Sequence, residues 1–372
     1  MKNKIKIIHI HKDPKFVHWV NMYSQDFFEN QLVFLGESNS ISNEYDNLLV
    51  SMPKDEEDRF LKIIELCENS DLVTINNLNS YALKITLALS LEVKIVWRFF
   101  GWELYSKDPK LIYSEKTRQL RPSYPKPSFT IQLKQYIWNL LYETPFEKAI
   151  KRMDYFIGLM DDEYLYFKKL GYKLPPFIQA PYLQSQPVKI DLVKSKLIVF
   201  GNSKNISNNH LDILETLKNV SLDNELKIKM FFSYGKETEY EKATKIEAKK
   251  NEQIEIEEDF LSKEEFKKVY IHAAAFIFNG YRQMAMGNIF TAIKYGVKIY
   301  LSDKNNSSNW FLKNGFIIFS IERHLEEDLR NNNYYLTQED ITNNIAMYVE
   351  LTKKYNVSKF NQKILKIATD NL

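Results

Sequence analysis

The chain has 372 residues, of which 44% are hydrophobic and 27% charged, with a formal net charge of +3. This apolar content excludes a disordered chain, and the length favours two domains. The small net charge gives no indication of nucleic acid, the single cysteine excludes a disulfide framework, and no apolar run reaches the roughly 20 residues that span a bilayer. We expect a cytoplasmic protein without a signal peptide, because the apolar start at 5–10 is short and runs into His11 and Lys12.

Strands alternate with helices through the first hundred residues. We expect buried strands at 5–10, 31–35, 71–75 and 93–99, with helical patterns between them at 16–28, 55–68 and 81–91. This alternation predicts an α/β domain with a mostly parallel sheet, in which ligands bind at the carboxyl ends of the strands. Polar or special residues follow those ends at His11, Asp13, His18, Asn76, Asn77, Arg98, Gly101, Trp102 and Glu103.

A basic aromatic segment, residues 107–152, interrupts the alternation. It carries ten Lys or Arg side chains against four acidic ones, interleaved with Tyr, Phe and Trp, and Pro122, Pro125 and Pro127 break its middle. Such a segment is suited to an anionic membrane surface. The alternatives are a solvated insertion whose aromatics pack on the sheet, and a surface on which single-stranded nucleic acid stacks.

After a strand at 153–159, a helix is expected at 161–170. Asp161 and Asp162 are interpreted as its caps rather than as a metal site. A proline-containing tract then predicts the connection between two domains. We place the first domain at 1–175, the linker at 176–196, the second domain at 197–345 and a C-terminal helix at 346–372.

The second domain repeats the pattern of the first. Strands are predicted at 197–200, 227–232, 253–257, 273–278, 297–301 and 316–319, with helices between them, one of which starts with a capping box of Ser262 and Glu265. The first domain has no GxGxxG, and the chain has no GxxxxGK[ST], HExxH or GxSxG string, so a P-loop NTPase, metalloprotease or serine hydrolase has no support. We expect neither a metal nor a cofactor.

The stretch from Tyr281 to Leu301 has the form of a phosphate-binding unit. A buried strand runs into a glycine-containing turn, and a helix follows that stops at Gly296. The free N–H groups and dipole of such a helix attract anions, and Arg282 adds a cation with a planar fork. The alternative is an ordinary βα turn with a surface arginine. The residues predicted to hold a diphosphate are Arg282, Gln283, Met286, Gly287 and Asn288.

Several strings together resemble the bacterial TDP-4-acetamido-4,6-dideoxygalactose (TDP-Fuc4NAc):lipid II transferases of enterobacterial common antigen synthesis. Gly101–Tyr105 matches a WGxDLY-like string of that family, with Glu103 in place of Asp. Gly201-Asn202-Ser203, Ser207-Asn208 and His210 match VGNSxxxSNxH. Arg282, Gln283 and Gly287 match ARQQGxGT, with Asn288 in place of a small hydroxyl residue.

The resemblance implies a GT-B glycosyltransferase, with two Rossmann-like domains facing a cleft. It implies a nucleotide-diphosphate sugar donor in the second domain, a lipid-linked glycan acceptor in the first, and work at the inner face of the cytoplasmic membrane. Gly201, Asn202 and Ser203 are then candidates for the donor's phosphate or sugar. His210 is a further candidate, or else a helix-packing histidine. Tyr234 and Gly235 are predicted to hold the nucleobase, or else to form a turn.

An inverting transfer needs a base for the acceptor hydroxyl. Glu103 is the first candidate, followed by Asp13 and His18; the alternatives are a helix cap, a surface charge or a core histidine. In a retaining transfer Glu103 would orient the acceptor instead. Two other functions fit the same fold: a nucleotide-sugar epimerase, and a non-catalytic sugar-nucleotide-binding protein.

Overall fold

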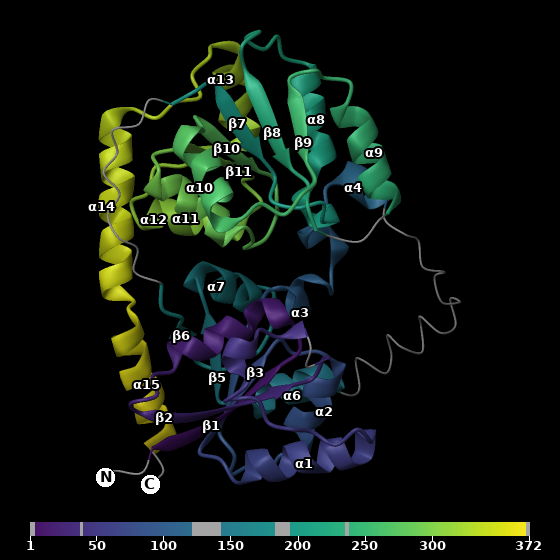
Figure 1. The fold of residues 1–372 in the computed structure, drawn as a ribbon, viewed down its shortest axis with the longest axis vertical. Coiled ribbons are helices and arrows are strands. Elements are labelled where there is room, and N and C mark those ends of the chain that lie inside the picture. Colours follow the sequence, from purple (N-terminus) through teal and green to yellow (C-terminus); the bar gives the residue numbers. More distant parts are fainter. Residues whose placement is uncertain (1–3, 38–39, 121–142, 183–193, 235–237, 370–372) are drawn as a thin grey trace. The chain divides into compact units, whose positions relative to one another are not determined.

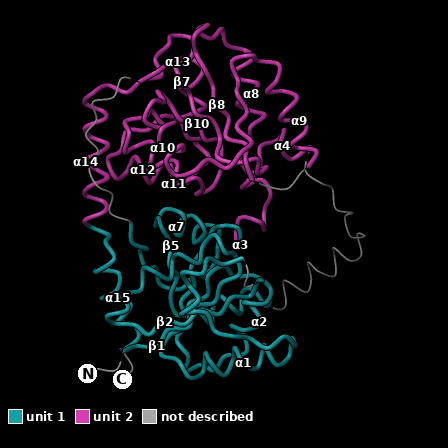
Figure 2. Tube along the Cα trace, in the orientation of Figure 1, with its two compact units in different colours: residues 1–103, 125–183, 354–372 teal, residues 104–124, 184–353 magenta. Residues whose placement is uncertain are grey.

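The computed structural model describes residues 4–37, 40–120, 143–182, 194–234 and 238–369. The chain divides into two compact units (Figure 2). Unit 1 comprises residues 1–103, 125–183 and 354–372, and unit 2 comprises residues 104–124 and 184–353. These units differ from the domain limits expected from the sequence, since 104–124 groups with unit 2 and the end of the chain groups with unit 1.

Unit 1 is built on a six-stranded parallel sheet with the order β2-β1-β3-β4-β5-β6 (Figure 1). Its strands are β1 (Ile5–His11), β2 (Phe28–Phe34), β3 (Leu72–Asn76), β4 (Ile95–Arg98), β5 (Tyr155–Gly158) and β6 (Phe177–Gln179). β3 and β4 are buried along their whole length, which explains their continuous apolar runs.

Helices surround this sheet, and their starts follow local capping rules. Asp55 accepts hydrogen bonds from two N–H groups at the start of α1, and Thr144 with Glu147 forms a capping box on α6. The helical elements are η1 (Pro14–Met22), η3 (Asn43–Tyr45), α1 (Glu56–Glu68), α2 (Ser80–Ala88), α6 (Pro145–Arg152), α7 (Asp161–Lys169) and α15 (Val357–Thr369). The short α3 (Trp102–Tyr105) spans the division between the units.

The last helix, α15, completes the core of unit 1. Phe360, Ile364 and Ile367 are buried in one cluster with Ile7 of β1 and Phe28 of β2. The sequence-based expectation of one helix at 346–372 is wrong in detail, because this region contains the end of α14 (Gln338–Lys354) and the separate α15.

Unit 2 repeats the architecture with the parallel order β12-β11-β10-β7-β8-β9. Its strands are β7 (Leu197–Phe200), β8 (Lys227–Phe231), β9 (Ile254–Glu257), β10 (Ala275–Phe278), β11 (Lys298–Leu301) and β12 (Phe319–Ser320). Its helical elements are η4 (Pro109–Leu111), α4 (Glu115–Gln119), η5 (Ile206–Asn208), α8 (His210–Lys218), α9 (Glu239–Ala248), α10 (Lys263–His272), α11 (Met286–Lys294), α12 (Asn306–Lys313), η6 (Ile321–Leu325), α13 (Glu326–Arg330) and α14.

Three local expectations are wrong. The helix expected at 16–28 is the 3-10 helix η1, which ends at Tyr23 in an extended conformation, and Phe28 already belongs to β2. The predicted linker contains β6, which pairs with β5. Asp161 and Asp162 do not cap α7: Met160 is its N-cap, without a side-chain bond, and the two carboxylates lie in the first turn, where the helix dipole favours them.

Candidate functional site

The loop between β10 and α11 sits at the carboxyl edge of the sheet in unit 2. β10 is fully buried, and the chain leaves it through Asn279 and Gly280. Ala285, the N-cap of α11, has a left-handed backbone with φ 54° and makes no side-chain cap bond. The first N–H groups of α11 therefore carry the positive end of the helix dipole without a capping side chain. A Cβ on Gly287 would meet no atom within 4 Å, so this end of the helix is open.

Asn305 fixes the path of this loop. The residue is fully buried between β11 and α12, and its Nδ2 donates to the carbonyl oxygens of Gly280 at 2.8 Å and Arg282 at 3.1 Å. Its Oδ1 accepts from the N–H of Ser307 at the start of α12. One amide therefore holds the backbone on both sides of Tyr281.

A second buried amide pair joins this loop to the loop after β7. Asn209 and Asn279 each donate Nδ2 to the other's backbone carbonyl, at 3.0 and 3.1 Å. Asn209 also donates to the carbonyl of Ile112 and accepts from the N–H of Ser114. Its left-handed backbone, with φ 49°, suits an asparagine. The sequence did not predict that Asn209, Asn279 and Asn305 hold these loops, because a local sequence pattern does not indicate hydrogen bonds between distant residues.

Gly201 and His210 pack against each other beneath the loop after β7. Gly201 has φ 70°, and a Cβ there would lie 2.8 Å from Nε2 of His210. The Tyr240 hydroxyl accepts from the His210 backbone N–H at 2.7 Å and lies 2.9 Å from Nδ1, within hydrogen-bond distance. Burial lowers the pKa of His210 to about 3. The histidine is therefore neutral and supports the loop from within the core.

Asn202 and Ser203 are held by Asn208. The N–H of Asn202 donates to Oδ1 of Asn208 at 3.0 Å, and Nδ2 of Asn208 lies 3.4 Å from the buried Ser203 hydroxyl. Ser207 places its hydroxyl 3.3 Å from the Met284 sulfur. This contact and the asparagine pair bring the two predicted donor loops together within unit 2.

The remaining predicted donor residues occupy different environments. Arg282 is half-buried in the β10–α11 loop, next to Gln283, whose Oε1 is buried without a hydrogen-bond partner. Met286 begins α11, and Asn288 donates to the Tyr270 hydroxyl at 2.9 Å. Tyr234 is 45% exposed beside Phe260, and Gly235 lies outside the described residues.

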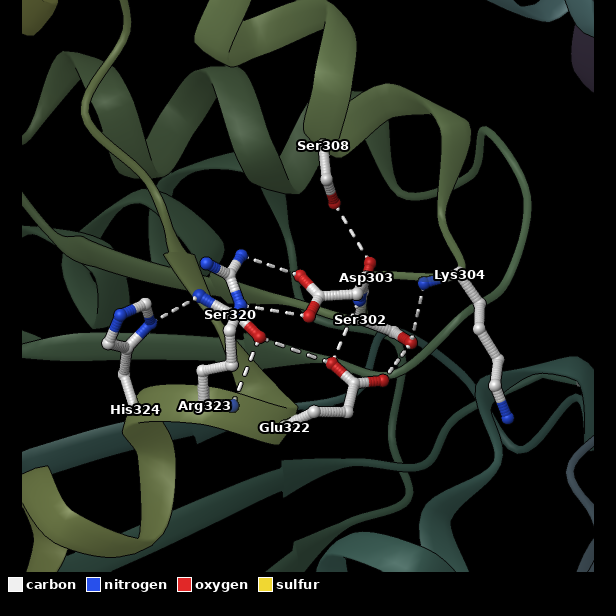
Figure 3. Close-up of polar contacts among 8 residues, drawn as sticks. All are labelled: Ser302, Asp303, Lys304, Ser308, Ser320, Glu322, Arg323 and His324. Carbon is white, nitrogen blue, oxygen red and sulfur yellow. Dashed lines mark hydrogen bonds and ion pairs between the residues drawn. The ribbon is translucent and has the colours of Figure 1, made fainter.

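A polar cluster at the β11 and β12 ends borders these loops (Figure 3). Glu322 accepts from the Ser302 hydroxyl at 2.5 Å and from the N–H of Asp303 at 2.8 Å. Arg323 binds Asp303 through two hydrogen bonds of 2.9 and 3.0 Å. Sequence reasoning missed Glu322, although its place just after a predicted strand could have indicated it.

In unit 1, Glu103 is 95% buried, with 5% of its surface exposed. Its Oε1 accepts from the N–H groups of Leu78 at 3.3 Å and Phe100 at 3.5 Å, so it ties the loop after β3 to the loop after β4. Burial raises the pKa of Glu103, and these backbone bonds only partly oppose that shift. A carboxyl group tuned in this way is suited to proton transfer.

The two other candidate bases lie on η1. Asp13 is exposed and caps η1 by accepting from the N–H of Lys15 at 3.0 Å. His18 is exposed, and its Nδ1 contacts the carbonyl of Lys15 at 2.9 Å. Asp13 therefore has the helix-cap role that was its alternative, whereas His18 is exposed and is not a core histidine.

Over the described ranges, no group of three or more His, Cys, Asp or Glu side chains has the arrangement of a metal site. Among the described helices none is long and apolar enough to cross a bilayer. Residues 121–142, the middle of the basic aromatic segment, lie outside the described residues.

Two parallel six-stranded Rossmann-like sheets with flanking helices define the GT-B fold, so the predicted fold class is confirmed. The structure is similar over 98% of this chain to all of Anabaena HepE, crystallised with UDP and glucose (TM-score 0.65, 9% identity). Over its whole length it is similar to a glycosyltransferase from Rickettsia africae ESF-5 (TM-score 0.63, 13% identity, all of that chain). Over 98% it is similar to all of the apo lipopolysaccharide outer core galactosyltransferase WaaB (TM-score 0.59, 12% identity).

No protein-family model matches the sequence, and no curated protein does. At these identities the likeness establishes the fold alone. The resemblance to the TDP-Fuc4NAc:lipid II transferases gains no support beyond that fold.

Proposed function

We propose that this protein is a glycosyltransferase that moves a sugar from a nucleotide-diphosphate donor to a lipid-linked glycan acceptor. The observation that carries the proposal is the β10–α11 loop, where an uncapped helix start, the open Gly287 and the half-buried Arg282 occur together. The UDP in the HepE structure supports a nucleotide-sugar donor for the same fold.

The chemistry of the leaving group fits this loop. Cleavage of a glycosyl–diphosphate bond leaves a nucleoside diphosphate that gains negative charge as the bond breaks. Fixed N–H groups and the Arg282 guanidinium stabilise such charge without a metal ion. Asn305 and the Asn209–Asn279 pair hold these donors in place beforehand, so the loop does not have to reorganise during transfer.

The donor and acceptor follow from the resemblance. We assign a donor that carries a deoxyamino sugar, such as TDP-Fuc4NAc. Gly201, Asn202 and Ser203 would lie next to the donor's phosphate or sugar, and Tyr234 and Gly235 next to its base. The acceptor is a lipid-linked glycan used in surface polysaccharide synthesis. The basic aromatic segment would then rest on the inner face of the cytoplasmic membrane.

Glu103 is our candidate for the acceptor's base. Burial raises its pKa, and its bonds to Leu78 and Phe100 fix its position. Asp13 and His18 are secondary candidates. His210 is assigned a supporting role under the donor loop because it is fully buried.

One experiment separates these roles. TDP, UDP and GDP are titrated against the full chain while the unfolding temperature is followed, and transfer is then assayed with the sugar of whichever nucleotide binds. We expect Arg282→Ala to abolish transfer and weaken nucleotide binding with the fold intact, and Glu103→Gln to lower turnover while nucleotide affinity stays the same. Arg330→Ala is the control, because Arg330 lies on exposed α13 and pairs with Glu326.

Each result bears on a different alternative. Wild-type turnover in Arg282→Ala rejects the donor site. Stabilisation by no nucleotide favours a non-catalytic protein. Conversion of the donor without any acceptor favours an epimerase.

A further inference from the structure

Among the residues that the structure describes, three buried nitrogen atoms at the carboxyl edge of the unit 1 sheet have no hydrogen-bond partner. They are Nη1 of Arg98, Nε2 of His11 and Nε1 of Trp19. Arg98 ends β4, His11 ends β1, and Trp19 lies on η1, which follows β1. The Arg98 guanidinium carbon lies 3.8 Å from the centre of the Trp19 ring, and His11 is close enough for the charge of Arg98 to affect it.

Arg98 is a buried cation that pairs with no carboxylate among the described residues. Only 5% of its surface is exposed. In the described parts of the chain, Tyr23 is the sole titratable neighbour that affects its pKa, which burial lowers to about 10. Arg98 therefore stays charged at neutral pH, and a ring face is a weak substitute for a carboxylate.

Lys298 in unit 2 is the other Lys or Arg side chain that is buried among the described residues. It is 2% exposed and pairs with Asp328 at 2.8 Å. The surroundings of Arg98 therefore differ from those of Lys298.

We propose that Arg98, His11 and Trp19 form a subsite for an oxyanion, a carboxylate or phosphate group carried by the acceptor. The guanidinium offers a planar fork of N–H donors, the indole offers one more, and His11 donates from Nε2 in the matching tautomer. Assigning the oxyanion to the acceptor rests on the proposed function, whereas binding of a free oxyanion does not.

The test titrates inorganic phosphate, glucuronate and glucose against the full chain at constant ionic strength, following the unfolding temperature. We expect phosphate or glucuronate to stabilise the protein and glucose to have no effect. Arg98→Met weakens that binding by about tenfold or more, the scale of a lost charge-assisted hydrogen bond. If glucuronate binds more tightly than phosphate, the acceptor carries an acidic sugar. If phosphate binds more tightly, the acceptor is phosphorylated.

A second readout tests whether Arg98 is merely structural. Without any oxyanion, Arg98→Met keeps or raises the unfolding temperature, because it removes an uncompensated charge. The control Arg59→Met lowers it, since the Arg59 guanidinium group binds the carbonyls of Pro53 at 3.0 Å and Lys54 at 2.7 Å. An Arg98→Met protein that fails to fold overturns the proposal. Trp19→Phe keeps a smaller aromatic ring but loses the N–H donor, so it weakens oxyanion binding in a folded protein.

The outcomes also separate this subsite from the donor site. Phosphate stabilisation that survives Arg282→Ala and disappears in Arg98→Met supports the subsite, and the reverse pattern overturns it. Nucleotide binding without any oxyanion effect leaves the proposed function standing and rejects the subsite. An oxyanion effect without nucleotide binding rejects the proposed function and keeps the subsite.

Discussion

The carboxyl edges of the two sheets differ in what holds their polar groups. In unit 2, Asn209, Asn279 and Asn305 bind loop backbone, and the first N–H groups of α11 have no capping side chain. In unit 1, Arg98 and His11 each carry a buried nitrogen that has no hydrogen-bond partner among the described residues. The edge in unit 2 is preorganised by its own hydrogen bonds. The edge in unit 1 holds a buried cation that, in our proposal, binds an oxyanion.

The largest effect expected for this comparison is the loss of the amide network. Asn209→Ala leaves the buried partners at Ile112, Ser114 and Asn279 without their bonds and places alanine at φ 49°. We expect a loss of about 4 kcal/mol of unfolding free energy, measured by urea denaturation, and loss of nucleotide binding. Unchanged stability would show that unit 2 is not preorganised by this residue.

An effect of intermediate size on the unfolding free energy is expected when the pH is lowered, through His210. Because the pKa of His210 is lowered to about 3 by burial, the unfolded chain binds a proton that the folded chain does not, below pH 6.5. Neutral His210 therefore makes its full contribution to the unfolding free energy above pH 6.5. That contribution falls by about 1.4 kcal/mol per pH unit as the pH is lowered towards 3. The slope of unfolding free energy between pH 6.5 and 5 should shrink by that amount in His210→Gln. His272→Gln is the control, since His272 is exposed at the end of α10.

The smallest effect on stability is expected at Gly287. A Cβ there meets nothing within 4 Å, so Gly287→Ala should change the unfolding free energy by less than about 1 kcal/mol. The methyl group nevertheless stands at the open helix start, where a phosphate would approach. Nucleotide affinity, measured by calorimetry, should fall while stability stays. Gly201→Ala is the contrasting variant, because its Cβ would lie 2.8 Å from His210 and its φ is 70°. Unchanged nucleotide affinity in Gly287→Ala would show that the donor does not bind at the start of α11.

The sequence predicted what depends on local pattern. Apolar runs located the strands, and capping residues located helix starts such as Ser262 with Glu265. Pattern is less reliable for the buried side of a helix: in α1 the apolar Leu61 is 59% exposed, while Ile63 is buried.

The candidate sites depend on distant parts of the chain, and that limited their prediction. The Asn209–Asn279 pair exists because β7 and β10 are neighbours in the sheet, although 70 residues separate the two asparagines. Strand-end reasoning identified Arg98 and Glu103 as edge residues. That reasoning did not indicate that Arg98 lacks a carboxylate partner among the described residues, or that Glu103 ties two loops together. Both facts depend on the surrounding atoms.

The position of α15 has a consequence for how the protein is made. Phe360 and Ile364 fill a core begun by Ile7, yet the whole second unit is translated between them. The first sheet therefore leaves the ribosome with part of its apolar surface bare and stays so until the last helix is synthesised. We expect a chain shortened to residue 353 to aggregate through that bare surface.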